Sequence, residues 1–415
     1  GEGSDWQKAI FRKAPIQSHQ LTVSQGNDKT QFVLSAGYMK QDGIAVGSNF
    51  KRYSIRFNLD TQVKKWLKLG NSLTVSYTDE RLNLYDQTGG IIQTALKSTP
   101  DVPVYNFDGT YATATGQGAR INPLAIALDQ LNSLKRTQML GNLYADVNLL
   151  KGLTFRTEFG GNVSFANALS FRPTYNYGPN VKNDVNSISD SRNQNTFWQF
   201  KNYFTYTRNF LVKHNVTAMI GQEASEWGFR NLSGSATGLP VNNVTSIGLA
   251  DVKSMTVNGA LPNTGALLSY YGRLNYNFDN KYYFTFTYRA DGSSNFGPGN
   301  RWGYFPAMAV SWRLSGENFM KSIENVVSDM KLRASWGLTG NQNIPSYAWG
   351  TKLAVMQTGL GAGYRSTNVP NPNVSWETAQ QVDLGLDLAL FSNKIEITFD
   401  YYNKIIKNLL MQQQL

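Results

Sequence analysis

The residues that could carry out acid–base chemistry are few and poorly placed for it. Asp383 and Asp387 share one face of a predicted strand, two alternations apart. Two carboxylates on one face can act as general acid and base, but on a strand they more often line a hydrated surface. His214 follows Lys213 at a predicted turn without an acidic neighbour, so we expect a solvated side chain. The sequence therefore predicts no catalytic residues and no enzyme activity.

Metal and cofactor sites are not predicted either. The chain has 415 residues with no cysteine and only two histidines, which excludes thiolate sites and disfavours histidine sites. The segment DGSSNFGPGN at 291–300 lacks the alternating acidic ligands and the terminal glutamate of a calcium loop. The glycine-rich GLGAGYR at 359–365 has no strand before it and no helix after it, so we interpret it as a flexible external loop.

The composition favours an all-β chain. Hydrophobic residues make up 41% and aromatic residues 13%, while amphipathic helical patterns are few and short. The net charge is +11, but the basic residues are scattered over polar strand faces and loops, which favours a solvated surface or contact with anionic lipid over nucleic-acid binding. No apolar run approaches the roughly 18 to 20 residues of a membrane-spanning helix, and residues 1–11 do not resemble a signal peptide.

Many segments alternate apolar and polar residues with a period of two, as strands with one apolar face do. Residues 382–402 read VDLGLDLALFSNKIEITFDYY and predict a hairpin that turns at FSN. About fourteen such strands are predicted, each of roughly nine to fourteen residues. On two of these hairpins we expect the apolar side chains to face lipid, and they are Tyr282, Phe284, Phe286, Leu384, Leu386, Leu388, Ile395 and Ile397.

Short and long connections alternate along the chain. Tight turns are predicted near Asn27, Lys64, Lys151, Asn209, Asn280 and Ser392. Long loops are predicted at about 80–137, 166–193, 228–265 and 339–380. Residues 120–136 space their leucines as a short helix would, and SGENFMKSIENVVSDM at 315–330 also looks helical. Short turns at one end and long loops at the other are typical of an outer-membrane β-barrel, whereas a soluble sandwich has no reason for this asymmetry.

The strand length agrees with that interpretation. A strand of ten residues spans about 33 Å and, tilted near 45°, covers about 24 Å of height, close to the apolar band of roughly 25 Å on such barrels. Several tyrosines, among them Tyr38 and Tyr77, are expected near strand ends, where an aromatic belt would meet the lipid headgroups. The alternative is that they are ordinary sheet aromatics. The sequence therefore predicts an antiparallel transmembrane β-barrel.

Several segments, in order along the chain, carry a resemblance to a known family. They are DWQKAIFRKAP at 5–15, YRADGSSNFGPGNRWGYFP at 288–306, KLRASWGLTGNQN at 331–343, NPNVSWET at 371–378 and DYYNKIIKNLL at 400–410. These segments resemble the SusC/RagA group of TonB-dependent transporters, and the resemblance runs over nearly the whole chain. It implies a barrel of roughly twenty-two strands with an N-terminal plug domain, in the outer membrane of Bacteroidetes-type bacteria.

The resemblance also implies partners. A surface lipoprotein of the SusD type would close over the barrel as a lid, TonB would supply energy through the plug, and a dimer of such transporter–lipoprotein pairs is left open. No plug precedes Asp5 and the chain ends in the polar MQQQL, so we expect residues 1–415 to be an internal part of the barrel, about fourteen strands of it. No cofactor is expected.

The predicted function is active import of large nutrients, oligosaccharides or oligopeptides. Aromatic loop residues stack on sugar rings or bury peptide side chains, which makes Tyr347, Trp349 and Tyr364 candidates for substrate contact. The alternative for these three is that they hold loops together or pack on the lipoprotein. Two other functions remain open, a passive fourteen-stranded channel and a soluble β-rich glycan-binding protein or hydrolase, which should carry carboxylates around aromatic platforms.

Overall fold

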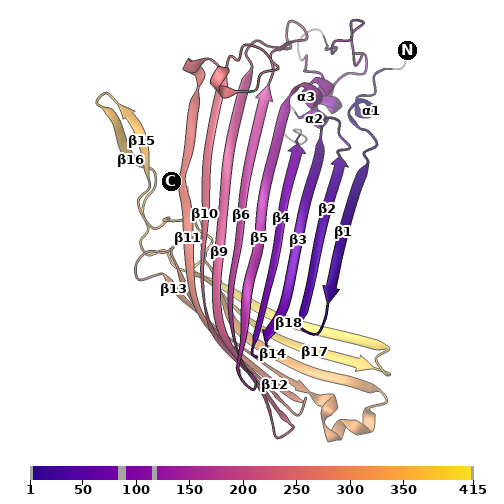
Figure 1. The fold of residues 1–415 in the computed structure, drawn as a ribbon, viewed down its shortest axis with the longest axis vertical. Coiled ribbons are helices and arrows are strands. Elements are labelled where there is room, and N and C mark those ends of the chain that lie inside the picture. Colours follow the sequence, from indigo (N-terminus) through magenta and orange to yellow (C-terminus); the bar gives the residue numbers. More distant parts are fainter. Residues whose placement is uncertain (1–2, 83–89, 115–118, 413–415) are drawn as a thin grey trace.

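The computed structural model describes residues 3–82, 90–114 and 119–412, and within them fourteen strands form one antiparallel sheet (Figure 1). The sheet follows chain order and skips only two small hairpins. Its strands are β1 (Ile16–Gly26), β2 (Thr30–Asp42), β3 (Asn49–Lys64), β4 (Leu67–Arg81), β5 (Leu131–Leu150), β6 (Leu153–Arg172), β9 (Ser187–Phe210), β10 (His214–Thr237), β11 (Thr256–Phe278), β12 (Tyr282–Ser293), β13 (Trp302–Arg313), β14 (Val327–Asn341), β17 (Glu377–Leu390) and β18 (Ile395–Lys407). This architecture confirms the predicted all-β fold and its number of strands.

The remaining elements lie in the connections. The small hairpins are β7 (Tyr175–Asn176) with β8 (Lys182–Asn183), and β15 (Leu353–Thr358) with β16 (Gly361–Ser366). The helices are α1 (Trp6–Ile10), α2 (Ile91–Lys97) and α3 (Pro123–Asp129), and the 3-10 helices are η1 (Ile247–Leu249), η2 (Val252–Ser254), η3 (Leu314–Gly316) and η4 (Asn318–Ile323). No helix among the described residues is long and apolar enough to cross a membrane.

Eight of the fourteen sheet strands are longer than the nine to fourteen residues that the sequence pattern predicted. β9 and β10 have 24 residues each, so the loop predicted at 166–193 shrinks to the stretch between Arg172 and Ser187, and the one at 228–265 to the stretch between Thr237 and Thr256. The predicted loops at 80–137 and 339–380 are likewise shortened, because β5 begins at Leu131 and β17 at Glu377. Side-chain alternation fades where both faces meet water, but backbone hydrogen bonding between strands continues.

Two helix predictions also needed correction. The helix predicted at 120–136 is only α3, because the chain enters β5 at Leu131. Asn122 caps α3 by accepting a hydrogen bond from the Leu124 backbone N–H at 2.9 Å, and Pro123 occupies the first turn. The segment at 315–330 forms the short 3-10 helices η3 and η4 rather than an α-helix, and then joins β14.

The packed interior lies at the loop end of the strands, in clusters of loop residues and strand-end residues. Figure 1 shows α1, α2 and α3 together at the end opposite the tight turns. They bury one apolar cluster, whose members include Trp6, Leu124 and Ile126. Ile10 and Ile91 belong to the same cluster and are fully buried. Burial of such side chains stabilises the loop end by roughly 1.5 to 3 kcal/mol each. The long loops are therefore folded structures and not loose connections.

The sheet has one apolar and one polar face, because many cross-strand rows contain residues of similar polarity. Phe286 lies between Leu274 and Met308 in one row. Thr285, the next residue along β12, lies opposite Asn275 in the adjacent row. The two faces follow directly from the alternation in the sequence.

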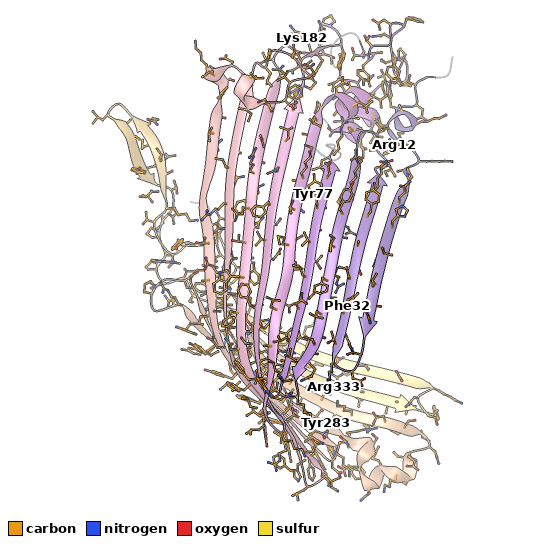
Figure 2. All side chains as sticks on the ribbon, in the orientation of Figure 1. Arg12, Phe32, Tyr77, Lys182, Tyr283 and Arg333 are labelled. Carbon is orange, nitrogen blue, oxygen red and sulfur yellow. The ribbon has the colours of Figure 1, made fainter. Side chains whose placement is uncertain are left out.

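A row of aromatic rings marks the loop-side limit of the apolar face. His19, Tyr38, Tyr53 and Tyr77 are register partners across β1 to β4. Their ring centres lie 6.2, 5.1 and 6.4 Å apart in succession. Figure 2 shows Tyr77 nearer to the loop end than Phe32, which belongs to the same face. Such a row is what the headgroup region of a membrane favours.

A second aromatic row lies on the same face at the tight-turn end. Tyr282 stacks on Trp312 at 6.1 Å. His214 was predicted to be a solvated turn residue, but its Nδ1 lies 2.8 Å from the Tyr276 hydroxyl and its ring 4.8 Å from the Phe278 ring. His214 therefore belongs to this row. The turn prediction missed it because its ring contacts come from β11, far along the chain.

Between the two rows, the apolar face has the height of a bilayer core. On β10 this face carries apolar side chains from Val216 to Ala224, with Gln222 as the exception, and then the charged Glu226 and Arg230. A run of nine residues covers about 20 Å of height at a tilt near 45°, close to the roughly 25 Å band of known barrels. Charged residues begin where that band would end.

Candidate functional site

Two adjacent rows of residues on the polar face form the candidate site, hereafter the inner belt. Their members are register partners from β3 to β12. The first row is Gln62, Lys68, Asp146, Arg156, Tyr203, Gly221, Tyr271 and Arg289. The second row is Asp60, Gly70, Tyr144, Glu158, Lys201, Glu223, Ser269 and Asp291.

One end of the inner belt is organised around Tyr144. The Arg156 guanidinium donates two hydrogen bonds to the Asp146 carboxylate, each at 2.5 Å, and lies 4.4 Å above the centre of the Tyr144 ring. The Tyr144 hydroxyl donates to Asp60, whose carboxylate also lies 3.4 Å from the Lys68 ammonium. Each charge of this group therefore has an opposite charge or a hydrogen-bond donor beside it.

The other end repeats this arrangement around Tyr271. The Arg289 Nε donates to both oxygens of Asp291 at 2.7 and 2.9 Å, and its Nη2 donates to Ser269 at 2.8 Å. The same guanidinium lies 3.8 Å from Glu223 and 5.6 Å from the centre of the Tyr271 ring. The Asp291 and Glu223 side chains are only 10% and 13% exposed, so Arg289 compensates two nearly buried carboxylates.

Glycines allow the tyrosine rings to lie flat against the sheet. Tyr144 lies directly over Gly70, its register partner on β4. A Cβ atom at Gly221 would come within 2.6 Å of Tyr203 Cβ and 2.9 Å of Tyr271 Cε2. These rings occupy the space that a side chain at either glycine would need. At these two positions the tyrosine side chains therefore lie close to the sheet backbone.

The centre of the inner belt alternates in charge. Lys201 is the register partner of Glu158 on one side and of Glu223 on the other. In total the inner belt carries five carboxylates and four cationic groups, so its charges nearly cancel. It can donate and accept hydrogen bonds along its length, but it contains no cysteine, histidine or serine paired with a base. Among the described residues, no group of three or more acidic, histidine or cysteine side chains could hold a metal ion.

The polar face continues with ion pairs beyond the inner belt. Arg333 donates to both oxygens of Asp387 at 2.8 and 2.9 Å and to Asp400 at 2.9 Å. Asp383 instead accepts hydrogen bonds from Ser335 and Gln381, at 3.0 and 2.7 Å. Figure 2 shows Arg333 near the tight-turn end. Asp383 and Asp387, which share one face of the strand, thus have separate partners and do not form an acid–base pair.

The eight residues predicted to face lipid all lie on the apolar face. Tyr282, Phe284 and Phe286 are register partners of Trp312, Val310 and Met308. Leu384, Leu386 and Leu388 are register partners of Tyr401, Phe399 and Ile397, and Ile395 pairs with Leu390. That this face touches hydrocarbon remains a prediction.

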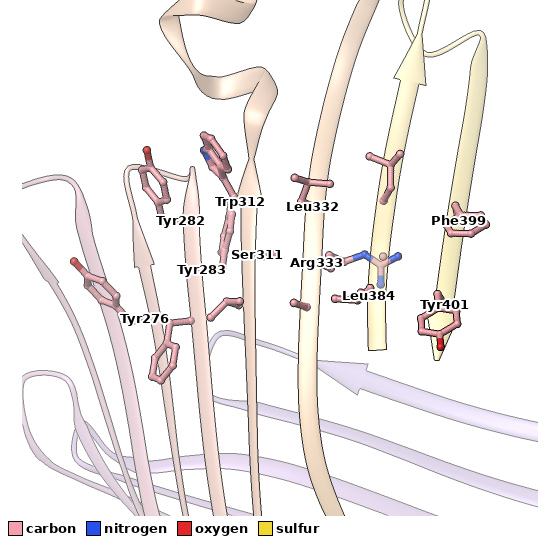
Figure 3. A pocket seen from close by; sticks show the side chains of 15 residues that line it. Tyr276, Tyr282, Tyr283, Ser311, Trp312, Leu332, Arg333, Leu384, Phe399 and Tyr401 are labelled. Carbon is pink, nitrogen blue, oxygen red and sulfur yellow. The ribbon is translucent and has the colours of Figure 1, made fainter. Parts of the chain in front are cut away.

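A hollow of about 760 Å³ also opens on the apolar face (Figure 3). Tyr282, Trp312, Leu384 and Phe399 contribute to its largely apolar lining. A polar solute would find few hydrogen-bond partners there, whereas the polar face offers many. We therefore place the candidate site on the inner belt and not in this hollow.

The three predicted substrate contacts are not brought together. Tyr364 lies on β16 and is 70% exposed, while Tyr347 lies in the preceding loop and is 58% exposed. Trp349 packs its ring close to Gly297. Within the described ranges no ring contact joins these three residues, so they do not form one aromatic platform.

The sequence analysis missed a tyrosine cluster in the loops. Tyr105 stacks on Tyr111 at 5.7 Å, Tyr111 meets Tyr177 edge-on at 5.6 Å, and Tyr175 stacks on Tyr177 at 4.9 Å. The hydroxyls of Tyr111 and Tyr177 donate to Asp129, at 3.4 and 2.7 Å. Burial, followed by the charge of Asp129, raises the pKa of Tyr111 to about 12. The recurring tyrosines of YNFDGTY and TYNYG were the available signal.

Comparison with known proteins identifies relatives of the whole chain. The family described as "TonB dependent receptor-like, beta-barrel" matches residues 81–415. TonB-dependent receptor P3 of Formosa agariphila is 33% identical over 432 residues, covering 99% of this chain and 42% of that protein. TonB-dependent receptor SusC of Bacteroides thetaiotaomicron is 30% identical over 449 residues, covering 98% of this chain and 42% of SusC. The chain thus spans less than half the length of these relatives.

Solved structures agree with the sequence relatives. The RagAB peptide transporter superposes with a TM-score of 0.88 at 26% identity, covering 100% of this chain and 47% of that one. The ferripyoverdine receptor of Pseudomonas aeruginosa superposes with a TM-score of 0.56 at 12% identity over 93% of this chain and 46% of the receptor, a likeness of fold alone.

Proposed function

Since this chain belongs to the TonB-dependent receptor family, whose β-barrels lie in the bacterial outer membrane, we propose that it forms part of the wall of an active importer of large nutrients. The observation that carries the proposal is the sheet with two unlike faces. One face is apolar between two aromatic rows, and the other carries the inner belt. A wall between hydrocarbon and a hydrated lumen needs this combination.

The inner belt suits passage rather than retention of a polar solute. Its hydrogen-bonding groups can replace part of the water around a sugar or a peptide. Seven of its nine charged side chains form ion pairs within the wall, which weakens their hold on an ionic solute. A transport path needs contacts that are favourable enough for entry and weak enough for release.

The proposal extends to the direction of transport and to the partners. We place the tight turns in the periplasm and the long loops outside the cell, where Tyr347, Trp349 and Tyr364 would meet substrate or partner. The likeness to the RagAB peptide transporter supports an oligopeptide as the nutrient. The resemblance to the SusC/RagA group extends the proposal to oligosaccharides and to a SusD-like lipoprotein as the lid. TonB would supply the energy through parts of the protein outside this chain. Pairs of importer and lipoprotein would assemble as dimers.

Uptake by cells tests the proposal. Cells carrying the whole protein are given labelled oligosaccharides and oligopeptides of increasing length, with and without an uncoupler that collapses the proton gradient. We expect accumulation of one class above the outside concentration, abolished by the uncoupler. Uptake that persists and only equalises concentrations would instead identify a passive channel. Cross-linking on the same cells shows whether the importer pairs with a lipoprotein and whether such pairs form dimers.

A further inference from the structure

A hollow of about 360 Å³ opens on the polar face of β1 to β4, separate from the inner belt. Three adjacent cross-strand rows line it. The middle row is Gln20, Gly37, Ser54 and Ser76, and the rows on either side contain Arg52 and Arg56. Arg52, Ser54 and Arg56 are alternate residues of β3, so their side chains share one face. We refer to this hollow as the arginine hollow.

The arginine hollow lies between the inner belt and the long loops. Arg56 and Asp60 of the inner belt are four residues apart on β3, which is about 13 Å along the strand. Tyr53, the residue after Arg52, points to the opposite face and belongs to the aromatic row at the loop-side limit of the apolar face. Figure 2 shows its register partner Tyr77 toward the loop end. A solute that enters from the loop end therefore reaches the arginine hollow before the inner belt.

The two arginines of this hollow have no counter-charge. Both side chains are exposed, and among the described residues neither guanidinium has an ion pair or a hydrogen bond. The strands β1 to β4 are described throughout, and the carboxylates on their polar face are Asp60 and Glu80. Asp60 belongs to the inner belt, and Glu80 accepts a hydrogen bond from Thr78 at 3.1 Å. Arg52 and Arg56 therefore present two free positive charges to the polar side of the wall.

Other arginines of the polar face are neutralised. Arg156, Arg289 and Arg333 each form an ion pair within the wall. Arg136 lies in the same cross-strand row as Arg52, two strands away, and within the described ranges it too has no ion pair. Three arginines without a counter-charge thus lie in neighbouring rows on the loop side of the inner belt. Such a group attracts anionic solutes and raises their local concentration.

The floor of the arginine hollow adds hydrogen-bond donors. The hydroxyls of Ser54, Thr74 and Ser76 have no hydrogen-bond partner in the part of the chain that the structure describes. Ser54 Oγ lies over Gly37, where a Cβ atom would come within 2.8 Å of it. A guanidinium presents a planar fork of N–H groups that matches the two oxygens of a carboxylate, and a hydroxyl donates one further hydrogen bond. The arrangement therefore suits a carboxylate.

We propose that the arginine hollow binds carboxylate groups of the nutrient, with Arg52 and Arg56 as the cationic contacts and Ser54 and Ser76 as further donors. The inference rests on the proposed function in taking the nutrient as the ligand. It adds the chemical class of that nutrient, an acidic oligomer, and the residues that recognise it. A carboxylate is the anionic group that uronic acids of oligosaccharides share with acidic side chains of oligopeptides.

Direct binding to the purified whole protein in detergent tests the arginine hollow. Short oligomers of galacturonic acid are compared by calorimetry with their methyl esters, which are neutral and otherwise alike. Blocked peptides that contain aspartate are compared in the same way with their asparagine counterparts. In at least one of the two pairs we expect the acidic member to bind at least tenfold more tightly, with a preference that weakens as the salt concentration rises.

The pair that shows the preference identifies the kind of oligomer, and a preference in both pairs means that the carboxylate alone is recognised. Equal binding of the acidic and neutral members in both pairs would overturn the proposal.

Charge removal on either face identifies the residues. The Arg52→Gln and Arg56→Gln double variant should lose the tenfold preference, while its binding of the neutral oligomer changes less than twofold. The matched control is Lys40→Gln with Lys51→Gln, which removes two cations from the opposite face of β2 and β3 and should keep the preference. Heat-modifiable migration on gels verifies that each barrel is folded.

Two outcomes of these substitutions contradict the arginine hollow. An equal loss of preference in the lysine control would mean that net charge alone attracts the acidic oligomers. A parallel loss of acidic and neutral binding in the arginine variant would mean that the two arginines hold another part of the whole protein in place.

Uptake separates this proposal from the proposed function. Cells carrying the arginine double variant should accumulate the preferred acidic oligomer at least fivefold more slowly than cells carrying the wild type. If the wild type binds acidic oligomers but cells show no accumulation that an uncoupler abolishes, the hollow stands and the importer is wrong. If the wild type and the double variant accumulate them equally, the importer stands and the hollow is not its binding site.

Discussion

Gly221 and Tyr271 face each other across β10 and β11, and the tyrosine ring occupies the space above the glycine. A Cβ atom at Gly221 would lie 2.9 Å from Tyr271 Cε2, closer than side chains approach one another. The pair explains how large tyrosine rings fit close to the sheet backbone on this face. Each ring lies over a glycine of the neighbouring strand, which has no side chain. Gly70 and Tyr144 repeat the relationship on β4 and β5.

Gly221→Ala should therefore destabilise the protein. The added methyl group pushes Tyr203 and Tyr271 from the wall, and overpacking of this kind costs about 1 to 3 kcal/mol. Gly160→Ala is the matched control, because Gly160 lies on the same face and a Cβ there would meet nothing closer than 3.8 Å. Urea unfolding from liposomes, followed by tryptophan fluorescence, measures both. Equal stability of the two variants would contradict the packing described here.

Arg289→Met should be far more damaging than Arg333→Met. The first substitution leaves the Asp291 and Glu223 carboxylates, which are 10% and 13% exposed, without their cation, at a cost of about 3 to 5 kcal/mol. The partners of Arg333 are 40% and 52% exposed, and water can replace the lost contacts at a cost of about 1 kcal/mol or less.

The same urea titration ranks these two arginine variants. Adding Asp291→Asn to Arg289→Met should recover part of the loss, since one of the unpaired charges is removed. No recovery in the double variant would show that Arg289 acts through packing and not through charge.

Phe286→Arg should cost about 2 to 4 kcal/mol if the apolar face meets hydrocarbon near the bilayer midplane. Thr285→Arg is the natural comparison, because Thr285 is the adjacent residue on β12 and faces the opposite side. A new cation there would be hydrated and should be tolerated. Refolding into liposomes of fixed thickness reports both values, and equal costs would mean that the faces are assigned wrongly.

The tyrosine cluster predicts a titration at high pH. The pKa of Tyr111 is raised to about 12, so folding favours its neutral phenol. The stabilisation is complete below about pH 10, the ordinary value for tyrosine, and disappears as the pH rises through about 12. Phenolate absorbance of the wild type minus that of Tyr111→Phe isolates this transition.

Asp129→Asn should move the Tyr111 transition to lower pH, because the carboxylate charge is one cause of the raised pKa. An unchanged transition would leave burial, the larger cause, as the whole explanation. The Tyr177 hydroxyl, which also donates to Asp129, should respond in the same direction.

Much of the sheet could be predicted because period-two alternation is a local property. Residues 384, 386 and 388 are assigned to one face by spacing alone, and the register of β17 with β18 then follows from the short turn between them. The loop-end halves of β9 and β10 could not be predicted. Residues there, such as Asp190 and Arg192, alternate with other polar residues, so the sequence shows no apolar–polar alternation.

The inner belt could not be predicted from sequence for a different reason. Its members come from eight strands, and Asp60 meets Tyr144 across a separation of 84 residues. Asp383 and Asp387 share one face of a strand, but each carboxylate bonds to a neighbouring strand. Knowing that a residue faces the polar side does not reveal its partner until the register of every strand is known.

The unbroken register of β9 with β10 determines how far the wall reaches. Their 24 paired residues extend about 80 Å along the strands, or about 56 Å in height at a tilt near 45°, more than twice the roughly 25 Å apolar band. About 30 Å of this hairpin therefore stands in water, beyond Glu226. An antibody against residues 226–232 should label intact cells, whereas one against residues 216–224 should find its epitope covered by the membrane.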